Sequence, residues 1–313
     1  MMAAPGAATR RNNGCLKAAS TRNRSTRNRV YIPPFVSYAT VAVFGLAFGS
    51  FLNVCIFRLP RGESVIAPRS HCPRCGKPIR WYDNIPVLSY LLLGGRCRAC
   101  RERISPIYPA VEILTATILV ATFARYALSP EFVKYAVLGM LLLIVIFTDL
   151  TARRIPHAVT LLGMGLGLLL SVIVPVDNRP LEWVLHWFGI FPEGVTSSLL
   201  GSAAGALFGG GLFYAAGQAF YYLGRRQKEY LGFGDVMLML MVGTFLGVPL
   251  TLVTMFLGSL VGSLIALPLE VATRRFRGYH WPYGSFLGTA AIYAALGGQA
   301  LLDAYLRWFG LAG

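Results

Sequence analysis

The stretch YLGFGDVMLMLMVGTFLG, residues 230–247, places a single acid at the edge of an apolar run. Asp235 is its only charged residue, and Gly232 and Gly234 stand shortly before it. An ionisable group inside or beside a segment that can enter lipid is costly, and it marks a functional candidate. The stretch therefore predicts two things together: a membrane-spanning helix and a carboxyl group with a chemical role.

The composition of the whole chain is that of a membrane protein. Of its 313 residues, 55% are hydrophobic and only 13% are charged, whereas soluble domains carry about 25% charged residues. The mean hydropathy of +0.58 agrees. A length of 313 residues would also suit two soluble domains, but this composition favours one multi-span bundle with a polar insert.

Long apolar runs predict an all-α polytopic membrane protein with about eight transmembrane helices. The first run, 35–57, is long enough to span, since a span needs roughly 20 apolar residues. We expect the chain to divide into a disordered basic tail, a first transmembrane helix, a polar insert and a second transmembrane domain, at 1–34, 35–57, 58–108 and 109–313. The later spans are expected at 109–128, 131–148, 158–175, 196–223, 236–247, 250–269 and 285–302.

The distribution of basic residues predicts the orientation of the bundle. If the insert is cytoplasmic, the loops on its side carry eighteen Lys or Arg and the loops on the other side carry four. Cytoplasmic loops of membrane proteins are enriched in these residues. The same enrichment explains the net charge of +16 without a nucleic-acid partner, and none is expected. The seven basic residues of the tail fall on the opposite side, against the rule.

Four cysteines in the insert predict a metal site. They form two C-x-x-C pairs, HCPRCG and RCRACR, with twenty-one residues between the pairs. Two such pairs at this spacing are typical of a structural zinc site. Disulfides are the alternative, and they are rare in a cytoplasmic segment. The expected zinc ligands are Cys72, Cys75, Cys97 and Cys100, and adjacent His71 would be redundant.

Two aspartates are expected to meet at one membrane face. Asp149 ends an outgoing run and Asp235 begins an incoming one, so both lie at the cytoplasmic edge. A close carboxyl pair shares one proton and can hydrolyse a peptide without a metal. A lone aspartate there is better explained as a cap or an ion pair, but a pair flanked by Gly232 and Gly234, which would admit an extended substrate backbone, favours catalysis.

Two further acids lie in or near apolar runs, and both are interpreted as structural. Glu112 is a possible partner for an arginine of the insert. Glu270 stands four residues before Arg274, where an ion pair suffices.

Five motifs in order give the chain a family resemblance. They are GSFLNVCIFRLPRG at 49–62, the cysteine-containing segment 68–112, DLTARRIPH at 149–157, GFGDV at 232–236 and WPYGSFLG at 281–288. Together they resemble the bacterial type IV prepilin peptidases, an aspartic membrane protease family with a G-x-G-D motif. Members often have lysine two residues after the second aspartate, where this chain has Met237.

The resemblance implies a bifunctional enzyme of the bacterial inner membrane. It would cleave the basic leader of type IV prepilins or type II secretion pseudopilins after glycine at the cytoplasmic face. It would then methylate the new N-terminus with S-adenosylmethionine, for which the sequence shows no glycine-rich fingerprint. The resemblance implies catalytic roles for Asp149 and Asp235, metal ligation by the four insert cysteines, and prepilins and membrane lipid as partners.

Three other functions would fit parts of the sequence. A zinc-stapled membrane scaffold would need no aspartate chemistry. A proton-coupled transporter would place its acids near mid-membrane with an inverted repeat, and neither is seen. A general intramembrane aspartyl protease without methyltransferase activity would not need the cysteine insert.

Overall fold

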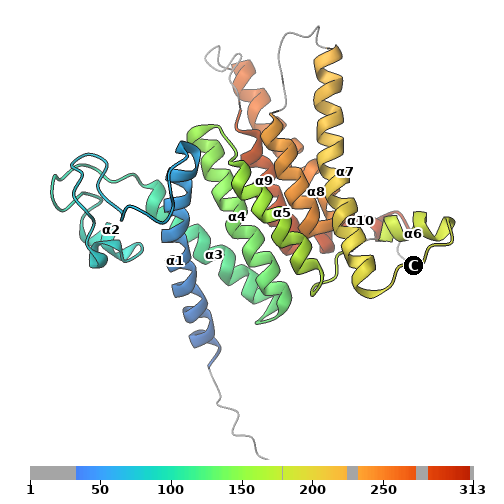
Figure 1. Ribbon diagram of the computed structural model, residues 1–313, viewed down its shortest axis with the longest axis horizontal. Coiled ribbons are helices and arrows are strands. Elements are labelled where there is room, and N and C mark those ends of the chain that lie inside the picture. The colour runs from blue at the N-terminus through green and yellow to red at the C-terminus, as the bar shows by residue number, and fades with distance from the viewer. Residues whose placement is uncertain (1–32, 178, 224–231, 273–280, 311–313) are drawn as a thin grey trace, which may run out of the picture.

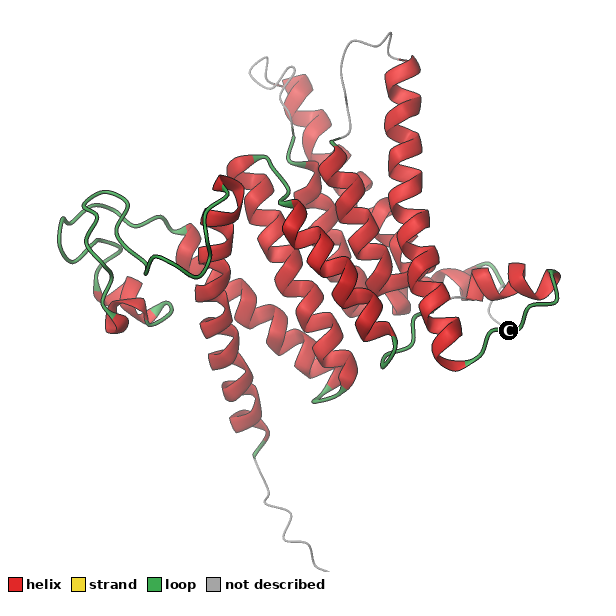
Figure 2. Cartoon of the chain, viewed as in Figure 1, coloured by secondary structure: helices red, strands yellow, loops and turns green. Residues whose placement is uncertain are grey.

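The computed structural model describes residues 33–177, 179–223, 232–272 and 281–310, and its core is a bundle of helices (Figures 1 and 2). Within these residues the β-type pairing consists of two isolated bridges in the insert. Except for its last two residues, the predicted tail 1–34 lies outside the described part. The elements are α1 Pro34–Arg58, η1 Leu59–Arg61, η2 Trp81–Asn84, α2 Leu88–Leu92, α3 Ile107–Tyr126, α4 Pro130–Ala152, α5 His157–Ser171, α6 Arg179–Trp187, α7 Gly194–Leu223, α8 Phe233–Ala272, α9 Tyr283–Tyr293, η4 Ala294–Gly298 and α10 Gln299–Trp308.

The helices confirm an all-α, multi-pass membrane protein. In the described residues six helical segments are long and apolar enough to cross a membrane: α1, α3, α4, α7, α8 and the C-terminal segment from α9 to α10. The predicted run 158–175 forms α5, which has only 15 residues. The predicted runs 236–247 and 250–269 both fall within α8. The number of spans therefore depends on α5 and α8, and eight remains a prediction.

Helix α8 is two helices that meet at a break. Gly247 has φ 70° and ψ −177°, which is not helical. A Cβ at Gly209 of α7 would lie 2.8 Å from the carbonyl oxygen of Met239 and 2.9 Å from Cγ2 of Thr251. A straight helix would separate those two residues by about 18 Å. The chain therefore reverses at Gly247, and both arms of α8 lie against α7.

Close backbone contact joins α7 to the first arm of α8. A Cβ on Gly243 would lie 2.1 Å from the carbonyl oxygen of Gly205, and a Cβ on Gly205 would lie 2.4 Å from that of Gly243. Small residues at helical spacing allow such approach in lipid, where helices associate largely by packing. Gly205 therefore lies on the face of α7 that packs against α8.

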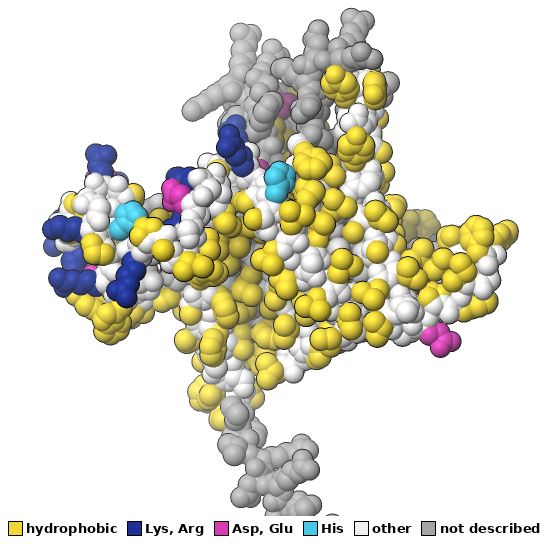
Figure 3. Space-filling model, viewed as in Figure 1, with side chains coloured by type: hydrophobic (Ala, Val, Ile, Leu, Met, Phe, Trp, Pro, Cys, Tyr) yellow, Lys and Arg dark blue, Asp and Glu magenta, His cyan; other side chains and the backbone are white. Residues whose placement is uncertain are grey.

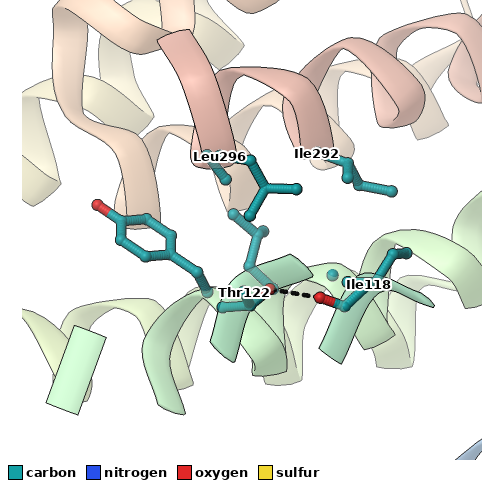
Figure 4. Close-up of a pocket in the computed structure, with 8 residues that line it drawn as sticks. Ile118, Thr122, Ile292 and Leu296 are labelled. Carbon is teal, nitrogen blue, oxygen red and sulfur yellow. Dashed lines mark hydrogen bonds between the residues drawn. The ribbon is translucent and has the colours of Figure 1, made fainter. Parts of the chain in front are cut away.

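The C-terminal helical segment packs on α3. Ile292 and Leu296 face Ile118 and Thr122 across the contact, and the Thr122 hydroxyl donates to the Ile118 carbonyl at 2.7 Å within α3 (Figure 4). Nearby, the Tyr126 hydroxyl donates to the carbonyl of Ala295 at 2.7 Å. That carbonyl lies in η4, a single π-helical turn between α9 and α10, so the hydrogen bond ties the end of α3 to this turn.

The insert lies beside α1 rather than on the end of the bundle (Figure 1). One hydrogen bond ties the insert to α3, and two contacts between α1 and α3 hold the two ends of the insert together. Val87, immediately before α2, donates its N–H to Glu112 Oε2 of α3 at 2.8 Å. The Asn53 amide of α1 donates to the Tyr108 carbonyl at 3.0 Å, and the Tyr108 ring stacks on Phe57 at 4.7 Å. Glu112 is thus structural as expected, but the donor in this contact is a backbone N–H rather than an arginine side chain.

The α7–α8 contact predicts a strong effect of one methyl group. Gly243→Ala should lower the free energy of unfolding by about 1–3 kcal/mol, as overpacking does, because its Cβ meets backbone that cannot move aside. The matched control is Gly211→Ala on α7, where a Cβ has nothing within 4 Å. Thermal unfolding in detergent should show a lower Tm for the first variant alone. Equal Tm values for the two variants would contradict the contact.

Candidate active site and metal centre

A cavity of about 380 Å³ opens where several helix ends meet. Leu59 and Pro60 after α1, the α4–α5 connection and the start of α8 all contribute to it. The charge pattern places these loops on the same side of the membrane, and in the structure they line one cavity. The complete lining is Leu59, Pro60, Asp149, Arg153, Arg154, Ile155, Pro156, His157, Gly232, Gly234 and Asp235.

Asp149 is positioned by the end of α4 and by the turn that begins α9. It lies in the last helical turn, before Arg153 ends the helix in a left-handed conformation with φ 51°. Its side chain is buried, at 8% exposure. Ser285 donates its backbone N–H to Asp149 Oδ2 at 2.9 Å, and its hydroxyl lies 3.2 Å from the same oxygen. Both contacts join residues 136 positions apart, so the fold fixes this carboxyl group.

Asp235 stands in the first turn of α8. Its N–H donates to the Gly232 carbonyl at 2.9 Å, and its side chain is 9% exposed. Gly234 packs on Ile155, because a Cβ there would lie 3.1 Å from the Ile155 Cβ. A Cβ on Gly232 would be 3.6 Å from Asp235 Oδ2. Gly234 therefore lies against Ile155 of the α4–α5 connection, and Gly232 lies beside the Asp235 carboxyl group.

The two aspartates meet at Gly284. The point that a Cβ would occupy on Gly284 lies 3.1 Å from Asp149 Oδ2, 3.2 Å from Asp235 Oδ1 and 2.8 Å from Ile155 Cδ1. One small group at that point would touch both carboxyl groups. Such a pair can share a proton and act together on a bound molecule. Gly284 and Ser285 belong to the WPYGSFLG motif, but sequence reasoning did not single out either residue.

Glu270 lies in a different interaction. It accepts a hydrogen bond from the Trp281 indole Nε1 at 2.8 Å, which ties the end of α8 to the start of α9. Its predicted partner Arg274 lies outside the described residues.

The four insert cysteines form one cluster. Their Sγ atoms all lie within 4.8 Å of one another, and all four are free thiols. Cys72 Sγ and Cys100 Sγ are 3.8 Å apart, as expected for two ligands of a tetrahedral ion with bonds of about 2.3 Å. The disulfide alternative is therefore wrong in this structure. The donor set and its geometry fit zinc.

Two equivalent turns build the cluster. Cys72 and Cys97 each donate their N–H to a carbonyl five residues on and accept an N–H from four residues on. Gly76 and Arg101, the residues after the second cysteine of each pair, both have positive φ, at 70° and 61°. Backbone N–H groups, chiefly that of Cys100, lower the pKa of the Cys97 thiol to about 7. His71 contacts the Arg69 carbonyl instead and is not part of the cluster.

The fold and site define a class: a multi-pass helical membrane protein with two buried carboxyl groups meeting at one end of the bundle. Comparison with known proteins then gives the family. Residues 43–126 match the bacterial peptidase A24 N-terminal domain, and residues 136–267 match the type IV leader peptidase family. The chain belongs to the type IV leader peptidase family, and the resemblance inferred from its motifs is confirmed.

Several relatives carry the name prepilin leader peptidase/N-methyltransferase. The protein of Myxococcus xanthus is 36% identical over 233 residues, which cover 74% of this chain and 63% of that protein. That of Bacillus subtilis is 31% identical over 265 residues, with 85% and 96% covered. That of Pseudomonas putida is 30% identical over 303 residues, with 88% and 95% covered. No solved structure matches the chain.

Proposed function

We propose that the chain cleaves the leader of type IV prepilins or type II secretion pseudopilins after a glycine, with Asp149 and Asp235 as the catalytic pair. The observation that carries this proposal is the meeting of both carboxyl groups at Gly284, beside an open cavity. Family membership supports the substrate class. The cavity lies at the end of the bundle, which suits a substrate whose polar leader stays outside the lipid.

The chemistry needs one ionised and one protonated carboxyl group. The ionised group takes a proton from water as the water oxygen attacks the scissile carbonyl carbon. The protonated group donates to the carbonyl oxygen. The carboxyl group that took the water proton then passes it to the leaving nitrogen as the C–N bond breaks, and a hydroxyl proton of the tetrahedral intermediate returns to the other carboxylate as the new carboxylic acid forms. The Ser285 N–H donates to Asp149 Oδ2, while the single proton of its hydroxyl is shared between that oxygen and the Ile146 carbonyl at 3.1 Å. Because such donors favour a charged carboxylate, Asp149 is suited to receive the water proton and Asp235 to hold one.

We further propose N-methylation of the new N-terminus, with S-adenosylmethionine as methyl donor. Family membership and the names of the relatives support this second activity. No feature of the described residues identifies which of them would hold the donor, so the derived chemistry ends at peptide cleavage. A gain of one methyl group on the product, measured by mass spectrometry, would test the activity separately.

Zinc in the cysteine cluster would have a structural role. Cys72, Cys75, Cys97 and Cys100 would fill all four positions of a tetrahedral ion, which leaves none for a reactant. The metal would join the two turns of an insert that contains only short helices.

We propose that the cavity and insert face the cytoplasm from the bacterial inner membrane. The basic loops support this orientation by the positive-inside rule. The convergence of Leu59, Arg154 and Gly232 on one cavity agrees, because all three belong to loops on the basic side.

The aspartate pair is tested by conservative substitution. Asp149→Asn and Asp235→Asn should each reduce cleavage of a co-expressed prepilin by at least about 100-fold, the lower end of general acid–base contributions. Both variants should still reach the membrane, because the amide keeps the shape of the carboxyl group. The control is Asp303→Asn in α10, which removes a charge far along the chain from the cavity. Cleavage that survives either active-site change would disprove the mechanism.

Gly284 offers a test of the geometry. Gly284→Ala would place a methyl group between the two carboxyl oxygens and against Ile155, so cleavage should fall strongly while the helices remain folded. The matched control is Gly165→Ala in α5, where a Cβ has nothing within 4 Å. Kinetics with purified prepilin and thermal unfolding would be compared. Normal cleavage by Gly284→Ala would show that the space between the carboxyl groups is not used.

The metal assignment predicts a simple stoichiometry. The purified full-length protein should contain one zinc per chain, and Cys75→Ser with Cys97→Ser should lose it, because two thiolates cannot close a structural site. Elemental analysis with thiol titration measures both. Less than one zinc per chain with all thiols reduced would refute the assignment.

A further inference from the structure

The insert carries an exposed apolar patch that the proposed chemistry does not use. We define this patch as Trp81 and Ile85, in and after η2, together with Leu88, Leu91 and Leu92 of α2. Trp81, Leu91 and Leu92 are exposed by 81%, 67% and 77%. None of the five lines the cavity at the aspartates. The three leucines follow i, i+3, i+4 spacing and so lie on one side of α2.

The patch is held at the depth of a membrane helix. Glu112, the sixth residue of α3, accepts the N–H of Val87 at 2.8 Å. That point lies about 7.5 Å along the axis from the start of α3. Since α2 follows Val87 directly, it lies beside a membrane span and not above it. Ser89 fixes α2 against η2 by donating to the Tyr82 carbonyl at 2.9 Å.

The rest of the insert has the opposite character. Residues 62–106 carry eight Lys or Arg, all exposed, against three acids. Two of those acids, Glu102 and Asp83, are in salt bridges with Arg74 and Arg98, so an excess of five positive charges remains. Figure 3 shows hydrophobic side chains gathered on the side of the insert where Figure 1 places α2, and Lys and Arg elsewhere on it. An apolar patch with basic residues around it is the pattern of a surface that lies in a membrane interface.

We propose that the insert docks on the membrane surface, with the patch in the lipid interface and the surrounding arginines on anionic phospholipid headgroups. The position of the patch and the charge around it together indicate the binding partner. A patch fixed beside a membrane span contacts lipid, and an excess of positive charge favours anionic lipid. Docking would hold the cysteine cluster at a constant height above the membrane. The inference does not depend on the proposed peptidase activity.

Photolabelling of the full-length protein in nanodiscs tests the proposal. The probe is a phosphatidylcholine with a diazirine in its acyl chain, in discs of phosphatidylcholine alone or with phosphatidylglycerol. Labelled sites are located by mass spectrometry, and the outward-facing Phe44 and Phe48 of α1, exposed by 60% and 46%, serve as internal positive controls. We expect label on residues 81–92, and more of it when phosphatidylglycerol is present. Label on α1 without label on 81–92 would overturn the proposal.

Two variants separate docking from folding. Leu91→Gln with Leu92→Gln should lose most of the label on 81–92 and keep its zinc content. The matched control is Ile66→Gln, which changes another exposed residue of the insert outside the patch and should keep the label. Three results would overturn the proposal. They are undiminished label in the double variant, equal label with and without phosphatidylglycerol, and slow hydrogen exchange of residues 88–92 without lipid label, since this last result would mean that protein covers the patch.

Discussion

Two carboxyl groups can lie close together in a membrane protein only where the fold forces them together and hides them from lipid. A charged group in the hydrocarbon layer is costly, and two like charges side by side are more so. The structure meets this constraint at a helix end, where α4 finishes and α8 begins. The turn into α9 completes the arrangement, with Ser285 bound to one carboxylate and Gly284 leaving space between the two. Each element must therefore end at a fixed residue.

The packing of α7 against α8 fixes the position at which α8 begins. Gly205 and Gly243 bring the two backbones into direct contact, and the reversal at Gly247 returns the chain toward the end that carries the aspartates. In lipid the hydrophobic effect contributes little to the association of helices, so close van der Waals packing must stabilise the contact. The first arm of α8, which carries Asp235 in its first turn, is enclosed by other helices, and Leu238, Met239 and Met241 are fully buried. Asp235 thus stands at the end of a closely packed segment.

Much of this could be predicted from sequence, because the deciding signals are local. Apolar length predicted a multi-pass helical membrane protein, C-x-x-C spacing predicted the cysteine cluster, and ordered motifs predicted the family, and the structure or the comparisons confirm these three; the count of eight spans stays a prediction. The roles of Gly284 and Ser285 could not be derived, because their partner Asp149 lies more than 130 residues away and a glycine gives no sign of what surrounds it. The same holds for Glu112, whose partner is a backbone N–H that leaves no mark in the sequence.

The insert has features that its local sequence predicts and features that depend on long-range contacts. The spacing of its cysteines is enough to predict the metal site. Its position, in contrast, depends on long-range contacts from Val87 to Glu112 and from Asn53 to Tyr108. The Asn53–Tyr108 contact lies in the last two turns of α1, and Leu59 and Pro60 of η1, which follows, line the cavity. Because η1 leads directly into the insert, a movement of the insert would reach this wall of the site through the chain itself. An insert that contains only short helices needs further contacts to hold its position. A metal bound by the cysteines and a lipid surface under the patch would both provide them.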